Sequence, residues 1–165
     1  AGMIDFPDPI GDAPAIYTLH SEVLTFGSSF GCTECTFQLS LGSAVLERLI
    51  ELKTAPPGEV VRAAAEAVKP SGQTISFHLI DAYSGDRHVR VTCKTSPMPE
   101  WGFGGSVIST SAPAAAAVRL MAQGKITAVG AIPPEAAMQP QDMFDELASR
   151  NAEFSVTEYS PGGVQ

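Results

Sequence analysis

Two neighbouring segments of alternating apolar and polar residues constrain the fold of this 165-residue chain most strongly. Residues 74–79 and residues 88–93 change from apolar to polar at every position, which is the period of a β-strand with one buried face. Residues 83–85 form a three-residue loop between them, in which Gly85 takes the position that needs a left-handed backbone. The sequence therefore predicts a β-hairpin in the middle of the chain.

The hairpin has a register that keeps its apolar side chains on a single face. Its cross-strand pairs are Phe77 with Val91, Leu79 with Val89, His78 with Arg90 and Ser76 with Thr92. A slip of one residue would carry the apolar side chains of one strand to the opposite face, so the alternation favours this register. The favoured register places the side chain of Arg90 on the polar face of the hairpin.

The remaining elements are predicted from hydrophobic periodicity and from turn residues. The expected helices are residues 44–53, 58–69, 113–123 and a last helix from Pro140 to about residue 151. The expected extended segments are residues 15–20, 22–26, 32–40, 126–132 and 152–159. This order predicts an α+β fold with a mixed, largely antiparallel sheet whose helices cover one face, in a single domain over residues 1–165.

Composition excludes several classes of protein. The chain is 44% hydrophobic, which is enough for a core, and its net charge of −8 repels nucleic acid and anionic membranes. It has no apolar run long enough to span a membrane, and the N-terminal residues lack the pattern of a signal peptide. Three cysteines are too few for a disulfide framework, so we expect a cytoplasmic protein.

The cysteines and two of the histidines have structural interpretations. Cys32 and Cys35 have CxxC spacing, but in a strand they would point to opposite faces, and Cys93 alone supplies no second pair of ligands. We therefore predict no metal site. His78 and His88 lie on the polar side or at the end of the hairpin, where solvated side chains are the rule.

Two polar segments remain open to a binding role. His20 lies among crowded polar residues, which favours a structural hydrogen-bond cluster and a ligand contact about equally. Ser109 and Thr110 precede an alanine-rich helix, where they either cap the helix or help its N-terminus to bind an anion. We identify no catalytic residue and no cofactor-binding loop, because the chain has no Ser/His/Asp triad, P-loop or glycine-rich dinucleotide fingerprint.

Several motifs in a fixed order, together with the hairpin, carry a family resemblance. They are DPIGD at residues 8–12, YTLHSE at 17–22, STSAPAA at 109–115, GKITAVG at 124–130, PPE at 133–135 and FDEL at 144–147. Over residues 8–159 the chain resembles the C-terminal domain of saccharopine dehydrogenase-like proteins, the group of saccharopine reductase and carboxynorspermidine dehydrogenase.

The resemblance implies one half of an oxidoreductase. In that family an N-terminal Rossmann domain binds NAD(P), while the second domain closes over an amino-acid-derived substrate and forms a homodimer. We expect this chain to be the substrate-binding and dimerisation domain of such an enzyme, which acts on C–N bonds. The Rossmann domain, and with it the cofactor, is expected to be absent from this chain, which would then be inactive alone.

The resemblance also implies a substrate with several carboxylates, so the domain should offer cations, hydroxyls and imidazole donors. The candidate substrate-binding residues are Tyr17, His20, Arg90, Ser109 and Thr110. Arg90 has the planar donor geometry that suits a carboxylate.

Two alternatives remain. The chain is a stand-alone, non-catalytic binding or assembly module, or it is the C-terminal domain of another amino-acid-pathway dehydrogenase, of the homoserine or dihydrodipicolinate type.

Overall fold

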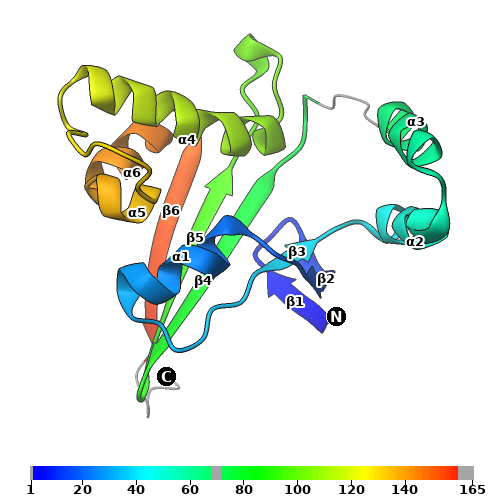
Figure 1. Cartoon of the computed structure of the whole chain (residues 1–165), viewed down its shortest axis with the longest axis horizontal. Helices are drawn as coiled ribbons and strands as arrows, with labels where there is room; N and C mark the ends of the chain where they lie inside the picture. The colour runs from blue at the N-terminus through cyan, green and yellow to red at the C-terminus, as the bar shows by residue number, and fades with distance from the viewer. Residues whose placement is uncertain (1, 68–71, 160–165) are drawn as a thin grey trace. The chain divides into compact units, whose positions relative to one another are not determined.

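The structure is a computed structural model that describes residues 2–67 and 72–159 (Figure 1). It divides into two compact units, Ala1–Lys69 and Pro70–Gln165. Both units combine helices with a three-stranded antiparallel sheet, so the predicted α+β class is confirmed. The strands are divided between two sheets, because each unit pairs only its own strands. No helix in the described residues is long and apolar enough to cross a membrane.

The first unit contains a small sheet and three helices. Its strands β1 (Gly2–Phe6), β2 (Gly11–Tyr17) and β3 (Gln38–Ser40) lie in the order β1-β2-β3. Helix α1 (Ser21–Phe30) connects β2 to β3. Helix α2 (Ser43–Glu51), the 3-10 turn η1 (Leu52–Thr54) and helix α3 (Pro57–Ala67) follow. The helices expected at residues 44–53 and 58–69 are therefore present, although residues 68 and 69 lie outside the described residues.

Two strands predicted for this unit are wrong. Residues 22–26 lie in α1, where Glu22 in the first turn favours the helix and Gly31 ends it with a φ of 67°. Of residues 32–40, only Gln38–Ser40 pairs with another strand. Strand β2 ends at Tyr17, opposite Gln38, so the pairing stops there. Leu39, which the alternation placed on the buried face, is exposed in β3.

The second unit is built on the sheet β4-β5-β6. Strands β4 (Ser76–Ser84) and β5 (Arg87–Thr95) form the predicted hairpin, and β6 (Ala152–Tyr159) pairs with β5 along its whole length. The 3-10 turn η2 (Pro99–Trp101) and helices α4 (Gly105–Ala122), α5 (Pro134–Ala137) and α6 (Pro140–Ala148) complete the unit. Figure 1 shows α4 crossing one end of the strands and α6 beside β6.

The hairpin register differs from the prediction. Leu79 lies opposite Thr92 and Ile80 opposite Val91, and the turn is only two residues long. The prediction assumed that the apolar residues of both strands share one face. In the observed register they are divided between the two faces of the sheet. The observed register instead places Asp81 opposite Arg90, and an opposite-charge pair across two strands stabilises that register.

The core of this unit lies between α4, α6 and the loop after β5. Met98, Ile108 and Ala112 form a buried cluster against which Leu147 packs. An ion pair from Arg119 to Glu146 joins α4 to α6, and Phe144 of α6 lies 4.8 Å from Phe154 of β6 between ring centroids. Helix α6 is thereby fixed to both α4 and the sheet.

Glycine is required where α4 meets the sheet. The N–H of Gly105 donates to the carbonyl of Thr74 at 2.5 Å. A Cβ atom on Gly105 would collide with the carbonyl oxygen of Thr95 and lie 2.8 Å from that of Thr74. The start of α4 can therefore approach the sheet this closely only because residue 105 has no side chain.

The predicted start of α4 at Pro113 is wrong. The helix begins eight residues earlier, with Gly104 at its N-cap, and Pro113 lies in its interior. Proline removes one internal hydrogen bond there, but the helix has buried side chains on both sides of it, Ile108 and Ala112 before and Ala116 and Leu120 after. Residues 126–132, expected to be extended, form no strand.

Candidate substrate-binding site

Five charged and aromatic side chains on one face of the sheet β4-β5-β6 form a single cluster. Cross-strand pairing places Asp81 beside Arg90, and it places Tyr83, His88 and Tyr159 in one row across all three strands. These five residues share a face because each is paired directly opposite another or lies two positions along the same strand. We call them the Arg90 cluster.

Arg90 is held by two parallel hydrogen bonds. Its Nε donates to Oδ1 of Asp81 at 2.8 Å, and its Nη2 donates to Oδ2 at 2.9 Å. A guanidinium has five N–H donors, so three remain, and the described part of the chain gives them no other partner. The side chain is about one-third exposed. Arg90 is therefore a fixed cation whose remaining donors are available to an anionic ligand.

His88 joins the charged pair to the aromatic row. Its Nε2 lies 2.7 Å from Oδ1 of Asp81. Its ring stacks between those of Tyr83 and Tyr159, at centroid distances of 4.4 and 4.5 Å. The expectation that His88 is solvated is wrong, since the stacking leaves less than a quarter of its side chain exposed. These contacts fix the orientation of Asp81, and through it that of Arg90.

The electrostatics of the cluster favour the charged forms of both partners. The hydrogen bonds from Arg90 lower the pKa of Asp81, against the opposing effect of burial, and the hydrogen bond from His88 lowers it further. The same contact with Asp81 raises the pKa of Arg90. Both side chains therefore stay ionised at neutral pH, and the pair can orient a ligand without itself exchanging a proton.

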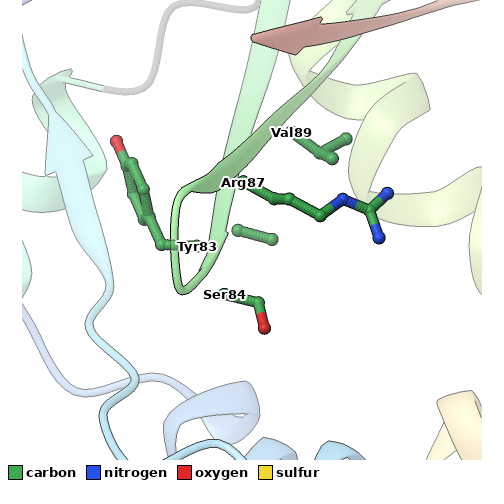
Figure 2. A pocket seen from close by; sticks show the side chains of 5 residues that line it. Tyr83, Ser84, Arg87 and Val89 are labelled. Carbon is green, nitrogen blue, oxygen red and sulfur yellow. The ribbon is translucent and has the colours of Figure 1, made fainter. Parts of the chain in front are cut away.

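A shallow depression lies at the tip of the hairpin, next to the cluster. Ala82, Tyr83, Ser84, Arg87 and Val89 line it (Figure 2), and its volume is about 200 Å³. Figure 2 shows the ring of Tyr83 and the guanidinium of Arg87 pointing in opposite directions. Pockets that enclose a small molecule usually measure about 300–1,000 Å³. The depression is too small and too open to enclose a substrate by itself.

Two predicted site residues, Tyr17 and His20, lie in the first unit. Tyr17 ends β2, and its side chain is exposed. His20 precedes α1, where it hydrogen-bonds to Glu22 and stacks on Phe37 at a centroid distance of 4.3 Å. Burial is the largest single effect on Glu22 and acts to raise its pKa, but the hydrogen bonds from His20, the backbone and Ser21 together outweigh it, so the pKa of Glu22 is lowered. These contacts are those expected if His20 belongs to a structural hydrogen-bond cluster. Its contact with a substrate stays a prediction.

Ser109 and Thr110 lie in the second turn of α4, not at its N-terminus. Both hydroxyls donate to the carbonyl of Ser106, at 3.2 and 2.9 Å, as serine and threonine often do inside helices. The prediction that they cap the helix is therefore wrong. At the true start of α4, the N–H of Gly105 donates to the carbonyl of Thr74, and the N–H of Ser106 donates to the hydroxyl of the same residue.

Sequence reasoning identified Arg90 and missed its surroundings. The alternation predicts no role for Asp81 or Tyr159, and it predicts a solvated His88. One signal could have found the pair, since Asp81 and Arg90 are the opposite charges nearest to the middle of the two strands. A register chosen to pair those charges would have placed His88 opposite Tyr83 as well.

The cysteines show no arrangement for metal binding or redox pairing. Cys32, Cys35 and Cys93 are free, and Cys32 and Cys35 precede β3 instead of lying within a strand. Burial raises the pKa of the Cys93 thiol, which makes it a poor nucleophile. Within the described ranges, no group of three or more His, Cys, Asp or Glu side chains could hold a metal ion.

Comparison with known proteins gives no match: no protein-family model, curated protein or solved structure corresponds to this chain.

Proposed function

We propose that this chain is the substrate-binding and dimerisation domain of an NAD(P)-dependent saccharopine dehydrogenase-like oxidoreductase. The family resemblance of residues 8–159 supports the proposal. In the proposed enzyme, these residues together form one functional domain. The structural observation that carries it is the Arg90 cluster, a fixed arginine with free donors on an ordered sheet face. The proposed location is the cytoplasm, which the low cysteine count favours.

In the proposed reaction, hydride moves to or from the carbon of a C–N bond that joins two amino-acid skeletons. NAD(P), bound by a Rossmann domain outside this chain, supplies the hydride chemistry. The residues of this chain bind and orient: Arg90 receives a substrate carboxylate, and Asp81 keeps the guanidinium in one orientation. The hydroxyls of Ser109 and Thr110 are proposed to accept hydrogen bonds from the substrate, because each already donates to the carbonyl of Ser106. A substrate contact of Tyr17 or His20 rests on the family resemblance alone.

Calorimetric titration with saccharopine, a secondary amine that joins two amino-acid skeletons, tests the binding role. Arg90→Ala should weaken binding by about 10- to 150-fold, since a hydrogen bond to a charged group contributes about 1.5–3 kcal/mol. Arg87→Ala is the matched control, because Arg87 lies on the same strand and faces away from the cluster. Equal affinities for Arg90→Ala and the unsubstituted chain, or equal losses in both variants, would contradict the proposal.

The second part of the proposal is that the chain transfers no hydride alone. NAD(P)H absorbance should stay constant when the isolated chain is mixed with substrate, since it has no dinucleotide fingerprint. Measurable turnover would show that it is more than half of an enzyme.

The third part is a homodimer. A specific interface buries at least about 1,000 Å² in total, and sedimentation at micromolar concentration should show twice the mass of the chain. A single species of 17.2 kDa would contradict it.

A stand-alone assembly module is the second candidate, and the helices of the first unit favour it. Val45, Leu49 and Ile50 of α2 and Val60 and Val61 of α3 are exposed, although they form the apolar stripes of amphipathic helices. Reading the coding sequence upstream of residue 1 separates the two candidates. A glycine-rich βαβ domain in the same frame supports the oxidoreductase, and its absence supports the module.

A further inference from the structure

The outer edge of β4 has the properties of a pairing surface. In the sheet order β4-β5-β6, β4 has a neighbour on one side only, and no other described strand pairs with its outer edge. It is nine residues long, and Ile80 and Tyr83 near its middle and end are 46% and 71% exposed. An exposed, long and apolar edge strand is a template for another strand, and proteins normally protect it with charges, proline or a bulge.

Charge separates this edge from the opposite one. The only formal charge on β4 belongs to Asp81, and Arg90 and His88 engage it within the sheet. At the other edge, β6 carries Glu153 and Glu158, and both glutamates are exposed. Charged side chains oppose pairing because they would lose water in an interface. Of the two edges of this sheet, β4 is the one left without such protection.

The sequence of β4 is self-complementary. Two antiparallel copies overlap over all nine residues only in the register centred on Ile80, which places Ile80 opposite itself. That register pairs Phe77 with Tyr83 of the other copy and Ser76 with Ser84. It also avoids placing Asp81 opposite its own copy, and an aromatic cross-strand pair stabilises a sheet. A second copy of this chain therefore matches the edge.

We propose that two copies of this chain associate through β4, in antiparallel register about Ile80, to form one continuous six-stranded sheet. The strand order is β6-β5-β4-β4-β5-β6, and the helices of both copies lie on the same face because the two-fold axis is perpendicular to the sheet. Phe77 of each copy then extends the row of Tyr159, His88 and Tyr83 in the other. This inference takes from the proposed function only that the chain dimerises.

Substitution with lysine at the two edges tests the proposal. Ile80 and Val156 both lie opposite Val91, on the same face and at opposite edges of the sheet, and both are exposed. Ile80→Lys brings two positive charges together at the two-fold axis and should raise the dissociation constant of the dimer at least about 100-fold. Val156→Lys is the matched control and should leave it unchanged, as measured by sedimentation equilibrium with circular dichroism to verify folding.

Cysteine crosslinking provides a second measurement that does not depend on weakening the dimer. In the proposed register, Ile80→Cys places two thiols directly opposite each other, so mild oxidation should give a covalent dimer. Val156→Cys should give none above the level of the unsubstituted chain, which has the same three native cysteines.

The outcomes separate this inference from the proposed function. A dimer that persists in Ile80→Lys, or that Val156→Lys dissociates, overturns pairing through β4 and leaves the proposed dimer standing. A monomeric unsubstituted chain overturns both the pairing and the dimer, while the titration of Arg90→Ala still tests substrate binding separately. The continuous sheet is supported if lysine dissociates the dimer, and cysteine crosslinks it, at position 80 but not at position 156.

Discussion

The two units of this chain use apolar residues in opposite ways. In the second unit, Ile108 and Leu120 of α4 are almost fully buried. In the described part of the first unit, Ala15 alone is buried, and the apolar stripes of α2 and α3 remain exposed. Apolar residues at helical spacing are therefore present in both units, but they form a core only where other elements of the unit cover them.

The largest expected effect is a core truncation in the second unit. Leu120→Ala should lower the free energy of unfolding by about 2–5 kcal/mol, because it leaves a cavity under α4. Leu49→Ala, in the exposed stripe of α2, should lower it by only about 0.5 kcal/mol. Urea denaturation followed by circular dichroism measures both, and equal losses would show that α2 has a buried partner in solution.

A pair of glycines sharpens the same comparison. Gly105→Ala should destabilise the second unit by about 1–3 kcal/mol, because the added methyl group meets the carbonyl of Thr95. Gly58→Ala adds the same group in α3, where it meets nothing within 4 Å. Since alanine is the better helix former, this variant should gain up to about 1 kcal/mol. Thermal unfolding of the two variants measures both shifts, and a Gly105→Ala chain as stable as the unsubstituted one would contradict the close approach of α4.

The smallest expected change in the free energy of unfolding comes from removing an ion pair. The pair of Asp81 and Arg90 should contribute about 1 kcal/mol at neutral pH, since both groups are partly exposed. The pKa of Asp81 is lowered in the folded state, so this contribution is present above the ordinary value of 3.8 and is lost as the pH falls through the folded value. The stability difference between the unsubstituted chain and Asp81→Asn should therefore disappear in acid.

A double-mutant cycle provides the control for that pair. Asp81→Asn and Arg90→Ala should combine with less than additive loss, whereas Asp81→Asn and Arg87→Ala should add. In the first unit, Arg48 and Glu51 of α2 form a more exposed pair, and Glu51→Gln should change the unfolding free energy by at most about 0.5 kcal/mol. A larger effect of Glu51→Gln than of Asp81→Asn would reverse the comparison between the units.

The elements that the sequence predicts correctly are those with a strong local period. The hairpin, the last strand at residues 152–159 and helices α2, α3 and α6 are each confirmed at or near the expected residues. The predictions of secondary structure fail where contacts with residues distant in the sequence determine an element or its ends. Helix α4 begins at Gly105 because that glycine can lie against Thr74 and Thr95, which the glycine-rich local sequence does not reveal.

The candidate site shows the same division. Arg90 could be chosen from the sequence because a guanidinium suits a carboxylate wherever it lies. Its partners could not, because they depend on the register. The alternation fits the predicted register with Phe77 opposite Val91, but the observed one lies three residues away. Side-chain alternation defines two faces within each strand, but it does not define how far one strand is displaced along the other.

By itself, the sequence determined the central hairpin with its arginine, the last strand, helices α2, α3 and α6, and the excess of acidic charge, because each of these depends on residue type and local spacing. Only the tertiary structure decided the alignment of β4 with β5, and with it the contacts of Arg90 with Asp81 and of His88 with two tyrosines. It also decided that the edge of β4 is open while the apolar side of α4 is covered. The physical reason is that pairing and burial are relations between residues far apart in the chain, and a local pattern is compatible with several of them.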